Sequence, residues 1–277
     1  MNSCDHQCGS CAQACSERTE PRESLKAPLA PGSRVGKVIG VVSGKGGVGK
    51  SLITGLLASK MQARGAHAAV MDADITGPSI PRLFGMTGRL MGDEEGFVPI
   101  RSTGGVDVVS MNLILEKPTD PVVWRGSIIA GVVRQFWSDV IWKDVDYMFI
   151  DMPPGTGDVA LTVYQSLPVD AVVIVTSPQE LVSMIVEKAV NMARLEGLDM
   201  NVIGLVENYS YCECPHCGEK MTIFGESRVE ETAARYGIPH VARLPLDPAI
   251  AQACDAGAVE SIDSPWLDAV ADALEAL

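Results

Sequence analysis

The chain has 277 residues, of which 47% are hydrophobic and 21% charged, values ordinary for a globular protein with one sizeable core. Its 35 acidic and 22 basic residues give a formal net charge of -13, which disfavours nucleic acid and anionic membranes as general partners. No apolar run approaches the roughly 20 residues that span a bilayer, and the polar start MNSCDHQCGS lacks the features of a secretion signal. We therefore expect a cytoplasmic protein.

The first part of the chain differs from the rest. Residues 1–15 hold four cysteines, and residues 16–34 mix charges with prolines and lack an apolar period, as a flexible tether does. In the reducing cytoplasm clustered thiols indicate metal binding rather than disulfides. The four are Cys4, Cys8, Cys11 and Cys15. We predict a flexible cysteine-rich arm over residues 1–34, followed by one domain over residues 35–277.

Beyond the arm, apolar runs of strand length alternate with longer amphipathic segments, which predicts a parallel sheet with helices on both faces. The clearest strands are Val38–Val42, Ala68–Asp72, Tyr147–Asp151, Ala171–Thr176 and Val202–Val206. The expected helices are Lys50–Arg64, Gly157–Leu167, Glu180–Glu196, Ser227–Tyr236, Pro248–Ala256 and Pro265–Leu277. A glycine-rich segment lies between the strands Ala68–Asp72 and Tyr147–Asp151, and we expect short strands in it near Phe97–Ile100 and Val106–Ser110. The predicted fold class is α/β, with a mostly parallel central sheet.

The stretch after the first strand matches the phosphate-binding pattern G-x-x-x-x-G-K-[ST] and opens a helix, as that motif requires. Backbone N–H groups of such a loop surround phosphate oxygens, Lys50 meets the β and γ phosphates, and Ser51 ligates Mg2+. The predicted nucleotide-binding residues of the loop are Gly44, Lys45, Gly46, Gly47, Val48, Gly49, Lys50 and Ser51. We therefore predict a P-loop NTPase that binds ATP and Mg2+.

Carboxylates at the ends of two other strands complete the predicted site. Asp151 ends the apolar strand of YMFIDMPPGTGD, where it can hold Mg2+ through water. Asp72 and Asp74 end the strand of VMDADITGPSIP. One of them could orient the attacking water while the other supports the metal, although either alone could be a turn or cap residue. Together these carboxylates indicate nucleotide hydrolysis.

The segments SGKGGVGKS, DADITGPSIP, DMPPGTGD and CPHCG together resemble the Mrp family of deviant P-loop ATPases, which carry and assemble iron–sulfur clusters. The resemblance implies that Lys45, the extra lysine of the loop, reaches across a homodimer interface to the partner's nucleotide, as an arginine finger does elsewhere. It also implies that Asp74 positions the attacking water and that Asp151 is the Walker B residue. Lys45, Lys50 and Asp74 are thus the predicted catalytic residues. Asn208 matches a position that contacts adenine in relatives, though it could equally form a turn.

A second cysteine group lies in CECPHCG. Cys214 and Cys217 have the two-residue spacing at which two thiolates grip one metal centre. One chain supplies too few ligands unless Cys212 and His216 join, whereas a two-fold homodimer brings two such pairs together. A bridging 4Fe-4S cluster or a Zn2+ ion is then possible, and the resemblance implies the cluster. Cys212 could be an alternative ligand or a turn residue, and Cys254 is expected to be a buried small hydrophobe.

The arm cysteines leave three alternatives open: a cluster, structural zinc, or a thiol-rich tail without metal. Scaffold members of the family that carry an N-terminal cluster have four cysteines at wider outer spacings than this chain does. The sequence alone therefore identifies the arm as a candidate metal site without choosing its metal.

The leading functional hypothesis is a slowly ATP-hydrolysing homodimer that holds a 4Fe-4S cluster and transfers it to apo-proteins, without nucleic acid or membrane as partner. Alternatives are a MinD- or ParA-like positioning ATPase, a nitrogenase-iron-protein-like electron donor, and an ATPase with structural zinc. The C-terminal SPWLDAVADALEAL is acidic and lacks Lys and Arg, which argues against docking on an anionic membrane. In the nitrogenase iron protein the cluster cysteines lie far apart in sequence, unlike a CxxC pair.

Overall fold

The computed structural model describes residues 26–74, 79–92, 96–114, 126–155, 157–178, 182–195 and 200–277. The arm cysteines predicted as metal ligands, Cys4, Cys8, Cys11 and Cys15, lie outside the described residues, so their role stays a prediction.

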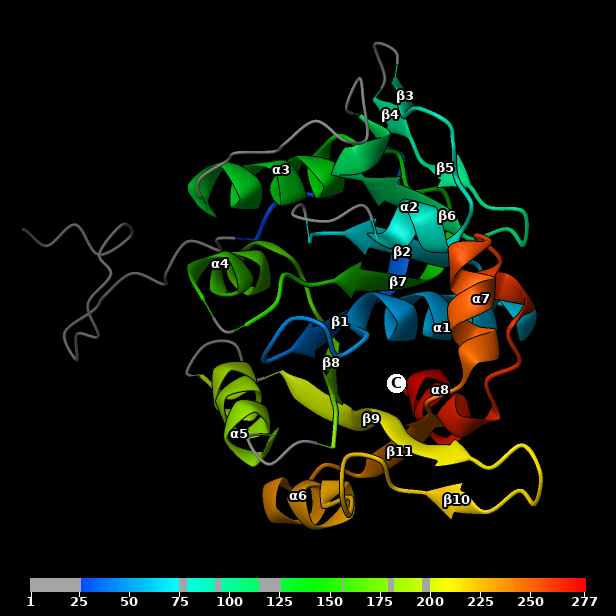
Figure 1. Cartoon of the computed structure of the whole chain (residues 1–277). Coiled ribbons are helices and arrows are strands. Elements are labelled where there is room, and N and C mark those ends of the chain that lie inside the picture. The colour runs from blue at the N-terminus through cyan, green and yellow to red at the C-terminus, as the bar shows by residue number, and fades with distance from the viewer. Residues whose placement is uncertain are drawn as a thin grey trace, which may run out of the picture.

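Nine strands of the described residues form one sheet, in the order β10-β9-β8-β1-β7-β2-β6-β5 with β11 also paired to β9 (Figure 1). Its parallel strands are β1 (Val35–Ser43), β2 (Ala68–Asp72), β6 (Asp107–Ser110), β7 (Val145–Asp151), β8 (Ala171–Thr176), β9 (Asn201–Glu213) and β11 (His240–Pro245). The antiparallel members are β5 (Ile100–Arg101) and β10 (Lys220–Met221). A separate two-stranded ribbon pairs β3 (Met91–Gly92) with β4 (Phe97–Val98).

Helices cover both faces of the sheet (Figure 1). One face carries α3 (Gly126–Ser138), α4 (Asp158–Ser166), α5 (Val182–Ala193) and α6 (Val229–Tyr236). The other carries α1 (Lys50–Ala63), the short α2 (Ser79–Leu83) and α8 (Asp268–Glu275), with α7 (Pro248–Asp255) in contact with α2. This three-layer arrangement confirms the predicted α/β fold with a mostly parallel central sheet.

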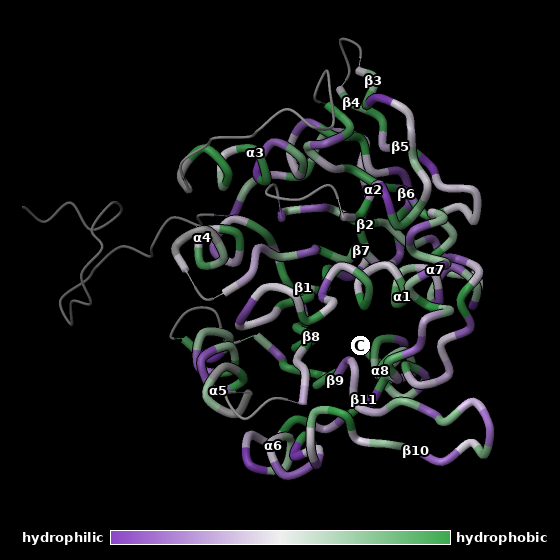
Figure 2. Tube along the Cα trace, viewed as in Figure 1, coloured by the Kyte–Doolittle hydropathy of each residue, from purple (hydrophilic) through white to green (hydrophobic). Residues whose placement is uncertain are grey.

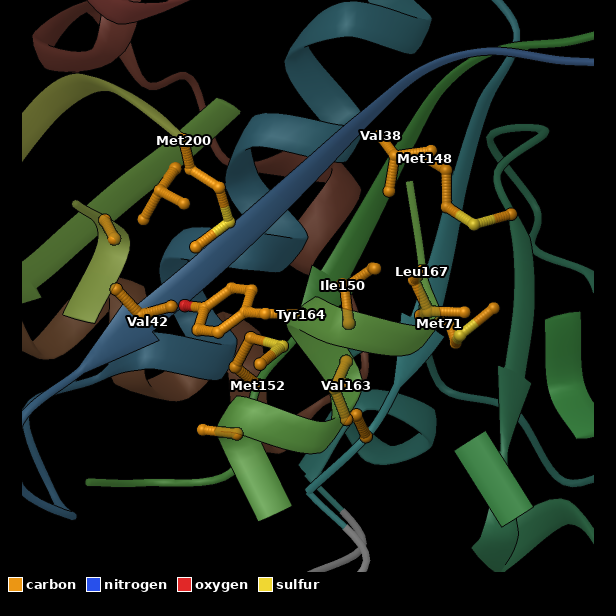
Figure 3. Packing of buried hydrophobic residues seen from close by; sticks show 14 of the residues in the cluster. Val38, Val42, Met71, Met148, Ile150, Met152, Val163, Tyr164, Leu167 and Met200 are labelled. Carbon is orange, nitrogen blue, oxygen red and sulfur yellow. The ribbon is translucent and has the colours of Figure 1, made fainter. Parts of the chain in front are cut away.

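The two layers of helices are held by alternating side chains of the central strands. In β1, Val38 and Val42 join the hydrophobic cluster under α3 to α6, whereas Ile39 and Val41 join the cluster under α1 and α8. Figure 3 shows Tyr164 of α4 lying between Val42 and Met152 in the first cluster. Figure 2 shows helices of mixed hydropathy around the sheet, as expected for helices with one face buried. The sheet is therefore a rigid platform for the loops at its edge.

The structure extends and adds to the predicted elements. The predicted strand Val202–Val206 is part of β9, which runs seven residues further to Glu213, so Asn208 lies within a strand rather than after one. The elements that were not predicted include α2, α3, β3, β10 and β11. Helix α3 does have an apolar face at the helical period, so the prediction overlooked it, whereas β11 is short and interrupted by His240 and Arg243.

The predicted tether is anchored at its C-terminal end. The Ala27 N–H donates to the Ser166 carbonyl at 2.7 Å, and the Trp137 indole donates to the Ala27 carbonyl at 3.1 Å. Ala27 and Ala30 are buried against the domain. Small apolar residues in a proline-rich stretch can fill a shallow surface groove, which composition alone does not reveal. Within the predicted tether, residues 26–34 thus include contacts with the domain, and the boundary of the arm at residue 34 stays a prediction.

The turns that end α2 and α7 touch through two glycines with positive φ, Gly85 and Gly257. A Cβ at Gly257 would lie 2.8 Å from the Gly85 nitrogen, a backbone atom that cannot rotate away. We expect Gly257→Ala to destabilise the fold by about 1–3 kcal/mol beyond the cost of positive φ itself. Urea unfolding measures this loss. The matched control is Gly237→Ala, which has φ 66° and open space around the added Cβ; equal losses in the two variants would contradict the proposed contact.

Candidate functional site

A cavity of about 430 Å3 opens at the carboxyl end of β1, where the glycine-rich loop turns into α1. Its lining includes five residues of the predicted loop, Gly46, Gly47, Gly49, Lys50 and Ser51. A Cβ added at Gly46 or Gly47 would meet no atom within 4 Å, so these glycines leave open space beside their backbone. Open backbone at a helix N-terminus suits phosphate oxygens. The residues present therefore fit a nucleotide.

Lys50 and Asp151 form a buried ion pair at the floor of this cavity. The Lys50 ammonium donates to Asp151 Oδ1 at 2.7 Å, and the Ser51 hydroxyl donates to Asp151 Oδ2 at 2.6 Å. The Thr54 hydroxyl lies 3.0 Å from both Asp151 Oδ1 and the Lys50 carbonyl. Burial raises the pKa of Asp151, and the charge and hydrogen bond of Lys50 oppose that rise. The predicted Walker B carboxylate and the predicted Mg2+-ligating hydroxyl are thus in direct contact.

Asp72 lies beside Asp151 because β2 and β7 pair in register at these two residues. It is fully buried, and the Ser110 hydroxyl donates to Asp72 Oδ2 at 2.7 Å. Burial raises the pKa of Asp72 well above its ordinary value, and the negative charge of Asp151 adds to the rise. A second buried carboxyl at this position can share a proton or support a cation, which is consistent with its predicted role near Mg2+.

Asp74 lies at the rim of the same cavity, where its Oδ2 is 3.4 Å from the Lys50 ammonium. Its N–H donates to Asp72 Oδ1 at 3.1 Å. The structure thus brings together Lys50, Ser51, Asp72, Asp74 and Asp151, which the sequence places in three separate segments. This convergence supports the predicted hydrolysis site, and the catalytic role of Asp74 stays a prediction.

Asn208 lies under the phosphate-binding loop. It is buried, and its side-chain amide donates to the Val48 carbonyl at 3.0 Å. Gly49 has φ +84, and a Cβ at this position would collide with the Asn208 amide. The next residue, Tyr209, has φ 61, unusual for a tyrosine, and lines the cavity. In this structure Asn208 supports the loop from below; its contact with adenine stays a prediction.

Lys45 is half-buried. It is not among the residues that line the cavity, although Gly46, the next residue of the loop, is. The Lys45 carbonyl accepts from the Ser43 hydroxyl at 2.9 Å, which fixes the start of the loop. The predicted contact of Lys45 with nucleotide, and the role across a dimer interface that the resemblance implies, both stay predictions.

The thiols lie on a hairpin formed by the end of β9 and β10. The Cys214 N–H donates to the Glu219 carbonyl and the Gly218 N–H donates to the Cys214 carbonyl, both at 2.9 Å. Gly218 has φ 73°, which closes this tight turn. Backbone N–H groups of His216 and Cys217 and the Cys217 thiol hydrogen-bond to the Cys214 sulfur and lower its pKa. A sulfur that accepts several N–H groups is favoured as a thiolate, the form that binds metal.

The hairpin has two different faces because side chains alternate along each strand. Cys212 lies opposite Met221 and Glu213 opposite Lys220. Cys212 and Met221 therefore share one face of the hairpin. We use the name thiol face for these two residues together with Cys214 and Ile223, which follow the ends of β9 and β10. Cys217 follows in the exposed turn. No group of three or more metal-ligating side chains occurs within the described residues, so the thiol face of one chain does not form a complete metal site.

Several residues in or behind the cavity were missed by sequence reasoning. Thr54 and Ser110 hold the carboxylates, but each is an ordinary hydroxyl whose role depends on strand register. Arg82 lines the cavity and pairs with Asp255 at 3.1 Å. Cys254, expected to be a buried hydrophobe, is instead half-buried and lines the cavity, because α7 ends against α2 there. No motif spacing signals these residues.

The raised pKa of Asp72 makes a prediction about stability. The folded state binds this proton more tightly than the unfolded state, so the carboxyl destabilises the fold increasingly as pH rises above the ordinary pKa of 3.8. Asp72→Asn should therefore raise the free energy of unfolding of the metal- and nucleotide-free chain more at pH 8 than at pH 5. Urea unfolding at both pH values measures the difference. Asp263→Asn, at an exposed position, is the control; a gain that shrinks with rising pH would refute the assignment.

Comparisons with known proteins agree with this site. A family model described as ParA, NUBPL iron-transfer P-loop NTPase, matches residues 34–277. An iron–sulfur cluster carrier protein of Clostridium perfringens is 44% identical over 267 residues, 91% of this chain and 93% of the relative.

Solved structures agree as well. A nucleotide-binding protein of Archaeoglobus fulgidus in complex with ADP is 41% identical, with a TM-score of 0.76 over 84% of this chain and 91% of that chain. The cell division ATPase MinD of Pyrococcus furiosus shares the fold at 20% identity, with a TM-score of 0.61 over 87% of this chain and 97% of that chain. These matches confirm the resemblance drawn from the sequence motifs, and the chain belongs to the NUBPL iron-transfer P-loop NTPase family.

Proposed function

We propose that this protein is an ATP-dependent iron–sulfur cluster carrier that acts as a homodimer in the cytoplasm, binds a 4Fe-4S cluster and transfers it to apo-proteins. The observation that carries the proposal is the continuity of β9. Asn208 of this strand supports the phosphate-binding loop, and Cys212 and Cys214 lie at its end. A change at the nucleotide can therefore move the thiols through one rigid strand.

A second copy of the chain completes the cluster site. Cys214 and Cys217 provide two thiolates where a 4Fe-4S cluster takes four. Beside them the side chains of Met221, Ile223 and Phe224 are 44%, 56% and 45% exposed. An exposed apolar patch of this kind favours burial against a partner, and a two-fold axis through the thiol face would supply the missing pair. The alternative to the cluster is a Zn2+ ion bound by the same four thiolates, and metal analysis distinguishes the two.

The nucleotide site is incomplete in the same way. Lys50 is shared between Asp151 and Asp74 within its own chain, so additional positive charge would help to stabilise the transferring phosphoryl group. We propose that Lys45 of the second copy provides it, with Mg2+ held by Ser51 and, through water, by Asp151. Slow ATP hydrolysis then loosens the dimer and changes the grip of the shared thiolates.

The alternative function is that of a positioning ATPase that docks on a membrane, and the structure of the C-terminal helix argues against it. The apolar side chains of α8, Val270, Ala271 and Leu274, are buried in the core. Its acidic side chains form ion pairs at the end of α1: Asp268 contacts Lys60 at 2.6 Å, and Asp272 and Glu275 contact Arg64 at 2.7 and 3.1 Å. The apolar face of α8 is therefore not available to a lipid surface. No helix in the described part of the chain is long and apolar enough to span a bilayer.

The proposal is tested by anaerobic reconstitution with iron and sulfide, on the full chain and on a version without residues 1–16. Iron, sulfide and zinc contents and the visible absorption spectrum are measured for both. A cluster retained without the arm assigns it to Cys214 and Cys217; zinc alone would replace the carrier proposal with a structural role, and a cluster that cycles its redox state during ATP turnover without release would support an electron donor.

We expect the double variant Cys214→Ser, Cys217→Ser to lose the cluster at the dimer interface and its transfer to an apo-protein acceptor, because the hairpin then offers no thiolate in the CxxC turn. Iron and sulfide contents per chain of the arm-deleted protein give the readout. Cys254→Ser is the control, since this thiol lies away from the hairpin. Full cluster content in the double variant would contradict the assignment of the cluster to Cys214 and Cys217.

We expect Lys45→Ala to lower kcat for ATP hydrolysis by about a thousandfold or more, the range of a charge supplied in trans, while nucleotide binding persists. An equal mixture of Lys45→Ala and Asp74→Asn chains should recover about a quarter of the wild-type rate, because half of the dimers then contain one intact site. Steady-state phosphate release measures the recovery. If Lys45 acts within its own chain, the mixture stays inactive.

A further inference from the structure

A second cavity, of about 450 Å3, lies at the base of the thiol hairpin and apart from the nucleotide cavity. Three strands and the short 3-10 turn before α8 (Pro265–Leu267) contribute to its wall. The lining residues are Tyr211 of β9, Lys220 of β10, Thr222, Arg243 of β11 and Trp266. None of these residues belongs to the phosphate site or to the CxxC turn.

The alternation of the hairpin places this cavity away from the thiol face. Lys220 pairs with Glu213, and this pair is next to the pair of Cys212 and Met221 along the two strands. The two neighbouring pairs therefore point to opposite faces of the hairpin. Thr222 follows with the same two-residue period as Lys220, whereas Met221 and Ile223 belong to the thiol face. A second copy docked on the thiol face therefore leaves the cavity accessible from the other side of the hairpin.

Two cations border the cavity. The Lys220 ammonium lies 4.3 Å from the centre of the Tyr211 ring, and its nearest carboxylate oxygen, of Glu213, is 3.8 Å away. The Arg243 Nε donates to the Ser210 hydroxyl at 2.8 Å, with the buried Glu207 behind it at 3.9 Å. Within the described residues the terminal nitrogens of Arg243 make no further hydrogen bond, so they can donate to a ligand.

The other walls are aromatic. Tyr211 is buried apart from its edge, and the half-buried Trp266 packs on the core below. Aromatic walls with cations at the rim favour a ligand that joins an apolar or aromatic group to a carboxylate. In a chain of net charge -13, paired cations beside an open cavity also attract an acidic partner locally.

We propose that this cavity is the docking site for a short acidic peptide segment of the recipient apo-protein. A carboxylate of the segment binds Lys220 and Arg243, and a neighbouring apolar side chain lies between Tyr211 and Trp266. The proposal rests on the carrier function, because a recipient held here lies on the same hairpin as Cys214 and Cys217. A peptide is favoured over a free small acid because the cavity borders β11, an edge strand whose outer backbone groups can pair with an extended chain.

The test uses the full chain and two fluorescently labelled hexapeptides, one alternating Asp with Leu and the other alternating Lys with Leu. Fluorescence anisotropy should show binding of the acidic peptide alone. Lys220→Gln and Arg243→Gln should each weaken it about tenfold or more, the effect of losing one charge-assisted hydrogen bond. Lys188→Gln on α5 removes the same charge from an exposed position outside the cavity and should leave binding unchanged.

Arg243 neutralises the buried Glu207, so Arg243→Gln could unfold the chain; the exposed Lys220, and the conservative Arg243→Lys, keep the test decisive. Equal binding by Lys220→Gln and the wild type, equal binding of the two peptides, or no binding of either overturns the proposal. A change in dimerisation in place of peptide binding also overturns it.

Cluster content separates this proposal from the carrier function. Lys220→Gln should bind as much iron and sulfide as the wild type and transfer the cluster more slowly to an apo-protein acceptor. Loss of peptide binding specificity with normal cluster content refutes only the docking site. A chain that binds the acidic peptide but holds no cluster refutes the carrier function and leaves the binding site standing.

Discussion

Lys50 and Asp151 form a buried ion pair on which the geometry of the nucleotide cavity depends. A buried charge is costly unless it is paired and hydrogen-bonded, and Asp151 accepts from Lys50 and Ser51 while Thr54 lies within reach. These contacts tie the start of α1 to the end of β7. In the proposed complex with ATP and Mg2+, phosphate oxygens and the metal would compete for the same groups: the lysine would turn to phosphate and the hydroxyl to the metal. The site is thus preorganised by partners that its ligands replace, which limits the reorganisation that binding requires.

The same loop is connected to the thiols by β9. This strand is 13 residues long, more than twice the length of β8 beside it, and its excess projects beyond the sheet as the hairpin (Figure 1). Near its middle, Asn208 holds the Val48 carbonyl, and Tyr209 takes a left-handed conformation. Backbone strain of that kind persists only where surrounding contacts fix it. The strained residue lies between the nucleotide and the cysteines, where a small change in the loop can be passed along the strand.

The sequence predicted what depends on local patterns. The strand before the glycine-rich loop, the loop itself and the carboxylates Asp72 and Asp151 follow from apolar runs and motif spacing. The contacts of Ser110 and Thr54 with the carboxylates could not be predicted. Ser110 reaches Asp72 because of strand register, and Thr54 reaches Asp151 because it lies one helical turn after Lys50. The length of β9 was missed because its distal half, ENYSYCE, is polar, and only pairing with β10 and β11 makes it a strand. The predicted cavity lining lacked Arg82 and Cys254 because they come from α2 and α7, which meet only in the fold.

The distribution of charge explains how an acidic chain can still select its partners. Lys60 and Arg64 are paired with carboxylates of α8, and Lys50 is paired with Asp151. These cations therefore add little to the electrostatic potential around the protein. At the hairpin, by contrast, the carboxylate contacts of Lys220 and Arg243 are longer, 3.8 Å to Glu213 and 3.9 Å to Glu207, and both cations also border a cavity. The thiol face beside them carries the exposed apolar side chains of Met221 and Ile223. In the proposed dimer, a second copy, which shares the overall negative charge, would be attracted through apolar burial on one face, whereas the proposed acidic recipient would be attracted through charge on the other. The two encounters would then not compete, and the proposed dimer would hold its cluster while the recipient docks.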